Sequence, residues 1–355
     1  MRKKKKICTS GIGGQAVLEG IMMKNKDLYA VAIRKPDGEI EIDTQEYHGV
    51  LHGSVLKKIP FIRGIFNFVD SMILGMRTLT YSASFYEEEE EKEKTEVKKE
   101  KFFDKLLGEK AESFLMGCTV AFSIVVAIAL FMLLPYFLSS LLEQYVRNTS
   151  LLAIIEGVIR IVIFLSYVIA ISAMKDIRRV YMYHGAEHKC INCLEHGHLL
   201  TVRNVKHSSR LHRRCGTSFL LFVMFVSIIL FIIIRVDHPV WRVVLRVALI
   251  PLIAGISYEI IRLAGKSNNI LVRILSAPGM LLQRLTTKEP DEDMIKVAIK
   301  SIEAVFDWKA FLEENFDFTD LKKSLEEDPE DTEEEEIEEE AKEVVKETET
   351  VEDAE

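Results

Sequence analysis

The residues His184, Glu187 and His188 have the types and the spacing of a hydrolytic metal site. Positions four apart share one face of an α-helix, so the two histidines can bind one ion. Glu187 is three residues from the first histidine, close enough to act as a general base on a water molecule. We therefore interpret the histidines as metal ligands and Glu187 as a candidate catalytic residue.

Four more side chains can supply further ligands to the same ion. They are Glu195, His212, Cys215 and Glu259. Glu195 continues the histidine stripe of the predicted helix. The His-x-x-Cys pair offers nitrogen and sulfur, which suit zinc. The H-x-x-E-H pattern is that of the inverted zincins, which use a downstream glutamate, and Glu259 is one candidate for it.

The number of protein ligands decides between two kinds of zinc site. If His184, His188, His212 and Cys215 all bind, the site is closed and structural; with three protein ligands, one position stays open for catalysis. The spacing leaves both open, together with the alternative that these histidines are polar helix-end residues without a metal.

Other motifs have a simpler structural interpretation. The pair Cys190 and Cys193 falls inside the predicted helix, so packing thiols are expected rather than a redox dithiol. His48 and His52 flank glycines and are interpreted as turn residues. Gly11 to Gln15 lacks the Gly-Lys-Ser/Thr of a phosphate loop, and we expect a tight turn there.

Four apolar segments are long enough to cross a bilayer and predict a mainly α-helical, polytopic membrane protein. The first contains Pro135, which marks a kink or the outer end. The segments span residues 113–142, 151–174, 216–234 and 240–264.

Charge in the connections predicts the orientation of these segments. The connection 175–215 carries nine Lys and Arg residues, whereas 143–150 and 235–239 carry one each. Because cytosolic loops keep positive charge, both termini are expected in the cytosol and the protein in the cell inner membrane as a multi-pass protein.

Charged residues inside the apolar segments should be paired, because an isolated charge in a bilayer is costly. Glu156 and Arg160 are one helical turn apart and are expected to pair with each other or with Arg242 and Arg246. Besides its possible role as a ligand, Glu259 can form a salt bridge with Arg262.

The regions outside the four apolar segments are predicted from their composition and residue patterns. We expect a β-hairpin from residues 28–35 and 39–46, and a helix start at Asp291 with a buried stripe after it. The predicted organisation is an N-terminal β-containing region (1–58), an interfacial helix (59–86), a charged linker (87–110), four membrane helices (111–280), C-terminal cytosolic helices (281–320) and a disordered acidic tail (321–355).

The net charge divides the chain into a basic body and an acidic tail. Residues 326–355 contain 18 acidic residues and two lysines, a net of −16, so the overall −8 leaves +8 for the rest. A basic body suits contact with anionic membrane lipids. Basic and aromatic residues are not interleaved in one module, so no nucleic-acid partner is expected.

Several segments resemble the YqhQ family of bacterial membrane proteins over residues 8–305. The resemblance rests on Gly13 to Met23, Tyr183 to Lys189, Arg214 to Phe219, Ala254 to Glu259 and Leu285 to Asp291. It implies a membrane protein of the kind labelled as a predicted metal-dependent enzyme.

Two functions remain open from the sequence. One is a membrane-embedded zinc-dependent hydrolase or peptidase with Glu187 as base, for which the substrate stays open and a protein substrate or protein partner is one option. The other is a non-enzymatic scaffold or binding protein with a structural metal site or no metal.

Overall fold

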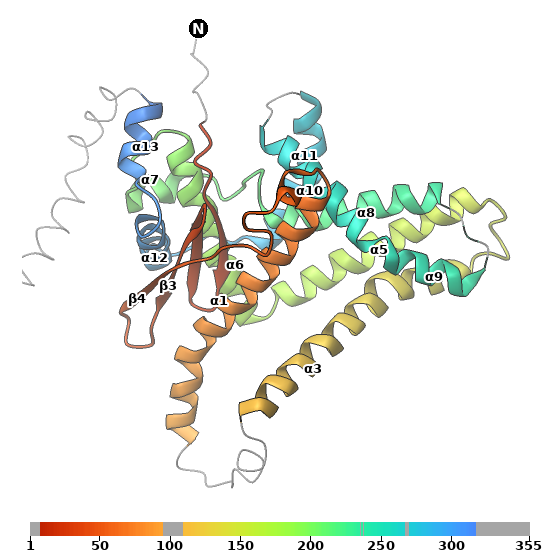
Figure 1. The fold of residues 1–355 in the computed structure, drawn as a ribbon, viewed down its shortest axis with the longest axis horizontal. Helices are drawn as coiled ribbons and strands as arrows, with labels where there is room; N and C mark the ends of the chain where they lie inside the picture. Colours follow the sequence, from red (N-terminus) through yellow and green to blue (C-terminus); the bar gives the residue numbers. More distant parts are fainter. Residues whose placement is uncertain (1–7, 95–108, 235, 237, 267–269, 317–355) are drawn as a thin grey trace, which may run out of the picture.

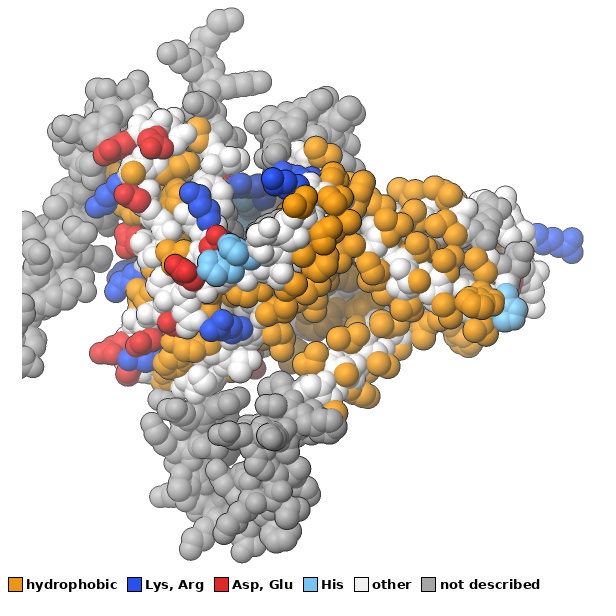
Figure 2. All heavy atoms as spheres, viewed as in Figure 1, with side chains coloured by type: hydrophobic (Ala, Val, Ile, Leu, Met, Phe, Trp, Pro, Cys, Tyr) orange, Lys and Arg blue, Asp and Glu red, His pale blue; other side chains and the backbone are white. Residues whose placement is uncertain are grey.

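The structure, a computed structural model, describes residues 8–94, 109–234, 236, 238–266 and 270–316. It is mainly helical with one small antiparallel sheet near the N-terminus. In Figure 1 the sheet lies at one end with α6 (Lys175–Glu195) and α12 (Glu292–Glu303). The apolar helices α5 (Thr149–Ser172) and α8 (Gly216–Ile233) extend away from it. Figure 2 shows hydrophobic side chains over this helical part and most charged side chains around the sheet.

The sheet has four strands in the order β1-β2-β3-β4, all antiparallel. Their bounds are Gly13–Val17 (β1), Gly20–Asn25 (β2), Leu28–Arg34 (β3) and Ile40–Glu46 (β4). The predicted hairpin is β3 and β4. The tight turn expected at Gly11 to Gln15 is wrong, because Gly13 begins an edge strand paired with β2.

The two faces of the sheet pack against different helices. Met23 and Ala30 belong to the core shared with α6 (Lys175–Glu195) and α12 (Glu292–Glu303). Val17 and Val31 pack on the other face with Leu74 of α1 (Ile62–Lys94). Alternating side chains of one strand thus bind two layers together.

Helix α1 covers most of the region predicted as an interfacial helix (59–86) and continues to Lys94, so the predicted start of the linker at residue 87 is wrong. It follows the short helix η1 (Val55–Lys58) and packs against α10. Large apolar side chains stay exposed along it, as an interfacial position requires. They are Val69, Met72, Ile73, Met76 and Leu79.

Three helical segments are long and apolar enough to cross a membrane. They are Gly117–Ser140, Thr149–Ser172 and Gly216–Ile233, which agree with the first three predicted spans. The second and third are α5 and α8. The first joins α3 (Glu109–Ile128), a π-turn (Ala129–Leu133) and α4 (Leu134–Ser140). The π-turn directly precedes Pro135, which lacks an amide proton for a regular helical bond.

The fourth predicted span, 240–264, differs from the other three. It is divided into α9 (Pro239–Ala248) and α10 (Ile250–Lys266), with Leu249 between them. Pro251 has no amide to continue the bonding of α9, which accounts for the break. The structure therefore supports three spans, and a fourth stays a prediction.

The buried charges of the bundle pair as expected. Glu156 accepts from Arg160 at 2.7 Å and from Arg246 at 2.6 Å, joining α5 to α9. Both guanidinium groups also stack over Phe231. The side chain of Arg242 lies outside the described residues.

The C-terminal helices complete the core beside the sheet. Asp291 caps α12 as predicted, accepting a bond from the Met294 amide at 2.8 Å. The other helices here are α7 (Val202–His207), α11 (Ile270–Thr286) and α13 (Trp308–Asn315). Residues 95–108 of the predicted linker and the whole predicted tail lie outside the described residues.

Candidate functional site

Helix α6 carries His184, Glu187 and His188 in a fixed position. The Lys288 amide donates to the Tyr181 carbonyl at 2.8 Å, which ties α6 to the segment after α11. Gly185 permits this approach, because a Cβ there would lie 2.0 Å from the Lys288 carbonyl oxygen. The helix predicted from the sequence is thus held by backbone contact.

Each histidine of α6 donates a hydrogen bond from one ring nitrogen to a backbone carbonyl oxygen. His184 Nδ1 lies 2.8 Å from the Thr286 oxygen, and His188 Nδ1 lies 2.6 Å from the Arg210 oxygen. A carbonyl oxygen only accepts, so both Nδ1 atoms carry the proton when the rings are neutral. Both Nε2 atoms therefore present a lone pair, the arrangement usual for metal-binding histidines.

Cys215 faces these two nitrogens. Its sulfur lies 3.2 Å from His184 Nε2 and also contacts the His188 ring. Cys215 is the N-cap of α8, where its sulfur accepts from the Thr217 amide at 3.4 Å. A helix N-terminus favours negative charge, so the position suits a thiolate ligand.

The three donor atoms form a compact group. One ligand atom each from His184, His188 and Cys215 all lie within 4.8 Å of one another. A tetrahedral zinc site places its donors roughly 3.4 Å apart, and the 3.2 Å between His184 Nε2 and the Cys215 sulfur is close to that spacing. The donor set therefore fits zinc with one position left for another ligand.

Glu187 lies beside this group and against the sheet. It is 6% exposed, and burial raises the pKa of its carboxyl, opposed by the nearby His184 and by a bond from the Gly14 amide. A raised pKa makes the carboxylate a stronger base, which suits the role of a general base.

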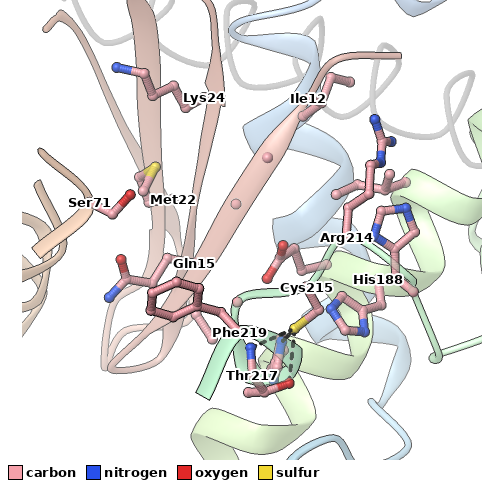
Figure 3. A pocket seen from close by; sticks show the side chains of 18 of the residues that line it. Ile12, Gln15, Met22, Lys24, Ser71, His188, Arg214, Cys215, Thr217 and Phe219 are labelled. Atoms are coloured by element: carbon pink, nitrogen blue, oxygen red, sulfur yellow. Dashed lines mark hydrogen bonds between the residues drawn. The ribbon is translucent and has the colours of Figure 1, made fainter. Parts of the chain in front are cut away.

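A cavity of about 790 Å³ borders the group, a size common for ligand sites. Its walls come from β1, β2, α1, α6, α8 and α10. Figure 3 shows β1 crossing the cavity, with Gln15 and Met22 on one side and Cys215 and His188 on the other. Apolar side chains line much of it, among them Phe68, Leu74, Phe219, Leu220 and Ile261.

Two other predicted ligands lie outside the compact group and contact each other. His212 Nε2 is 3.5 Å from Glu195 Oε2. Glu195 also accepts from the Ser10 amide at 2.9 Å and from Arg214. Burial acts to raise the pKa of Glu195, but the bond from His212, the charge of Arg214 and the Ser10 amide lower it to about 2. Glu195 therefore fixes the segment before β1 to the end of α6.

Glu259 is likewise engaged elsewhere. It accepts from Arg63 Nε at 2.7 Å, and Arg262 lies 3.9 Å away. Because Arg63 belongs to α1, this carboxylate joins α1 to α10 instead of reaching the histidines.

A second group of possible ligands lies on the surface. Asp27, His48 and His52 have donor atoms within 4.8 Å, and all three are exposed. Cys190 and Cys193, in contrast, are buried in the core with raised pKa values caused by burial, as packing thiols would be.

Several residues of the site were not assigned from the sequence. They are Gly14, Arg210, Thr217 and Thr286. Arg210 and Thr286 act through their backbone carbonyls. Every residue type has this group, so the sequence does not point to these positions. Gly14, Thr217 and Thr286 do lie in segments that carry the family resemblance.

The fold and this site define a class of membrane protein: three apolar helices joined to a sheet-containing part with a histidine and cysteine cluster between them. Residues 59–308 match the family described as "Protein of unknown function (DUF1385)", and the chain belongs to this family. It is 37% identical over 310 residues to the "Uncharacterized protein YqhQ" of Bacillus subtilis (strain 168). That match covers 85% of this chain and 94% of the relative. No solved structure matches the chain.

Proposed function

We propose that this protein is a membrane-embedded, zinc-dependent hydrolase with His184, His188 and Cys215 as ligands. The observation that carries the proposal is the bonding of the two histidines. Both Nδ1 atoms donate to carbonyl oxygens, so both Nε2 lone pairs face the Cys215 sulfur. Bound there, zinc supplies Lewis-acid chemistry and activates water near neutral pH.

Glu187 is the general base in this proposal. It lines the cavity and is held by the Gly14 amide, so it can take a proton from the attacking water and return it to the leaving group. The oxygen of water bonds to the carbonyl carbon as the bond to the leaving group breaks. Proton transfer by a positioned carboxylate contributes about 10²–10⁴-fold to such a reaction.

The competing function is a scaffold with a closed, four-ligand metal site. The fourth ligand would be His212, whose ring centroid lies 5.7 Å from that of His188 and whose Nε2 faces Glu195. A closed site therefore needs His212 to turn away from Glu195, whereas an open site needs no such change. This difference favours the enzyme.

Zinc content separates these functions. The variants should be made in a His48→Ala/His52→Ala background, because the exposed surface group could bind zinc and obscure the count. We expect about one zinc per chain, lost in His184→Ala and Cys215→Ala but kept in His212→Ala and Glu187→Gln. Loss in His212→Ala would establish the closed site, and no zinc in the background protein would overturn both.

We also propose that the site faces the cytosol of a bacterial inner membrane, with α9 and α10 forming a fourth crossing. The support is the charge asymmetry of the connections, nine basic residues in 175–215 against one in 143–150. Reporter insertions at Thr149 and His238 should read as external. A third reporter at Asn315, beyond α9 and α10, should read as cytosolic; an external signal there, with His238 also external, would mean that α9 and α10 return without crossing.

A further inference from the structure

The substrate class follows from the edge of the sheet that borders the cavity, on the assumption that the proposed hydrolase is correct. Among the residues that the structure describes, strand β1 pairs only with β2; the partners include Gly13 and Lys24, Gln15 and Met22, and Val17 and Gly20. A two-residue turn joins the strands, so these pairs exchange the backbone bonds.

Gly14 and Ala16 alternate with these residues along β1. Their backbone amide and carbonyl groups must therefore point away from β2. Gly14 also lies against the Glu187 side chain. Within the described part of the chain, the Gly14 carbonyl and the Ala16 amide and carbonyl have no hydrogen-bond partner. This unpaired edge can accept another strand.

The same edge lies next to the candidate reacting groups. Residues 11–16 line the cavity together with His184, Glu187, His188 and Cys215. In Figure 3 β1 runs past Cys215 and His188. A polypeptide hydrogen-bonded along β1 would therefore bring its backbone carbonyls close to the group of His184, His188 and Cys215.

Two glycines leave room for such a chain. A Cβ added at Gly11 or Gly13 would meet no heavy atom within 4 Å, whereas one at Gly14 would meet the Glu187 carboxyl carbon at 2.9 Å. The absence of side chains at the first two positions opens the approach to the strand. Strand addition obtains affinity from main-chain bonds and specificity from pockets for alternate side chains.

We propose that the substrate is an extended polypeptide segment with apolar side chains, which binds as an added strand on β1. Apolar walls from α1, α8 and α10 provide contacts for its side chains, through Phe68, Phe219 and Ile261. Exposed apolar residues of α1 place the entrance at a membrane surface, so a segment flanking a membrane helix of another protein is the expected source. Water adds to the peptide carbonyl carbon, the C–N bond breaks, and Glu187 passes the proton to the leaving amine.

The test uses the full chain in detergent with the change Glu187→Gln, which prevents turnover. The probes are a fluorescent pool of ten-residue peptides with apolar residues at alternate positions, the same pool N-methylated at every second amide, and a fluorescent lysophospholipid. We expect the first pool to bind and N-methylation to weaken binding at least about tenfold, since the main-chain bonds are lost. Equal binding of both peptide pools, or binding of the lipid alone, would overturn the proposal.

A second variant guards against indirect effects. Gly13→Val fills open space next to β1 without a clash, and the backbone at Gly13 does not need glycine. We expect at least about a tenfold loss of peptide binding with an unchanged thermal midpoint and unchanged zinc content. Glu41→Val, exposed on the opposite edge strand β4, is the matched control and should bind normally. Full peptide binding by Gly13→Val would contradict the proposed position.

Zinc measured in the same samples separates this proposal from the proposed function. Zinc without peptide binding overturns the peptide substrate and leaves the hydrolase standing. Peptide binding without zinc overturns the hydrolase and leaves the β1 edge as a peptide-binding site.

Discussion

Gly14 and Glu187 are in direct contact, although 173 positions separate them in the sequence. The Gly14 amide lies close enough to the Glu187 carboxylate to lower its pKa, and a Cβ on Gly14 would lie 2.9 Å from the carboxyl carbon. The edge strand thus holds the candidate base in position, and the base leaves no space for a side chain on the strand.

Gly14→Val should therefore displace Glu187 without touching the zinc ligands. We expect about 1–3 kcal/mol lower stability from overpacking, unchanged zinc content, and loss of hydrolysis. Thermal unfolding, elemental analysis and cleavage of the peptide pool measure these effects. Gly117→Val, which enters open space in α3 and does not line the cavity, is the control; equal loss of hydrolysis in the two variants would mean that Glu187 is not held by this contact.

Glu195 should make stability depend on pH at the acid end. Its folded pKa of about 2 lies below the ordinary 4.5, so its contribution is complete above pH 4.5 and is lost as pH falls toward 2. The shift corresponds to about 3 kcal/mol. Denaturant unfolding between pH 6 and pH 3 should show a decline in wild type that is smaller in Glu195→Gln.

The control for Glu195 is an exposed ion pair. Glu292 pairs with Lys206 at the surface, where such pairs contribute little. Glu292→Gln should keep the wild-type pH profile. A profile for Glu195→Gln that matches wild type would show that Glu195 does not stabilise the fold through its charge.

Glu259→Gln should weaken the attachment of α1 to α10 and leave zinc in place. The change removes the charge that Arg63 contacts, whereas none of the three clustered donors touches Glu259. Hydrogen exchange should rise at the start of α1, near Arg63, by several-fold or more, with zinc content unchanged. Zinc loss in this variant would make Glu259 a ligand after all.

Glu156→Gln should destabilise the membrane part strongly. Glu156 neutralises two buried guanidinium groups, those of Arg160 and Arg246. Removing one partner of a buried pair costs about 3–5 kcal/mol, because charge remains uncompensated. Unfolding in detergent measures it, with the exposed Glu143→Gln as control. A loss below about 0.5 kcal/mol, the level of ordinary surface changes, would contradict this role.

Local features of the sequence predicted much of the fold. Long apolar runs indicated three spans that the structure supports, and the capping pattern at Asp291 indicated where α12 begins. The spacing of His184 and His188 placed them on one helical face. Each of these depends on residues within a few turns of one another, so the sequence contains the whole signal.

The broken fourth segment and the edge strand were not predicted. Pro251 lies in an otherwise apolar run, and composition does not show that α9 and α10 separate there. The sequence predicted a turn at Gly11 to Gln15, because glycine disfavours strands. Pairing with β2 overrides that preference, since β2 supplies the backbone bonds and fixes the register.

The sequence by itself determined the candidate chemistry: two histidines one turn apart, a glutamate beside them, and a set of possible further ligands. Only the tertiary structure decided that Cys215 meets the histidines while Glu195, His212 and Glu259 are held in other contacts. The reason is physical. Residue type sets which groups can bind a metal, but the contact between α6 and the N-terminus of α8 and the competing charges of Arg63 and Arg214 set which of them can reach it.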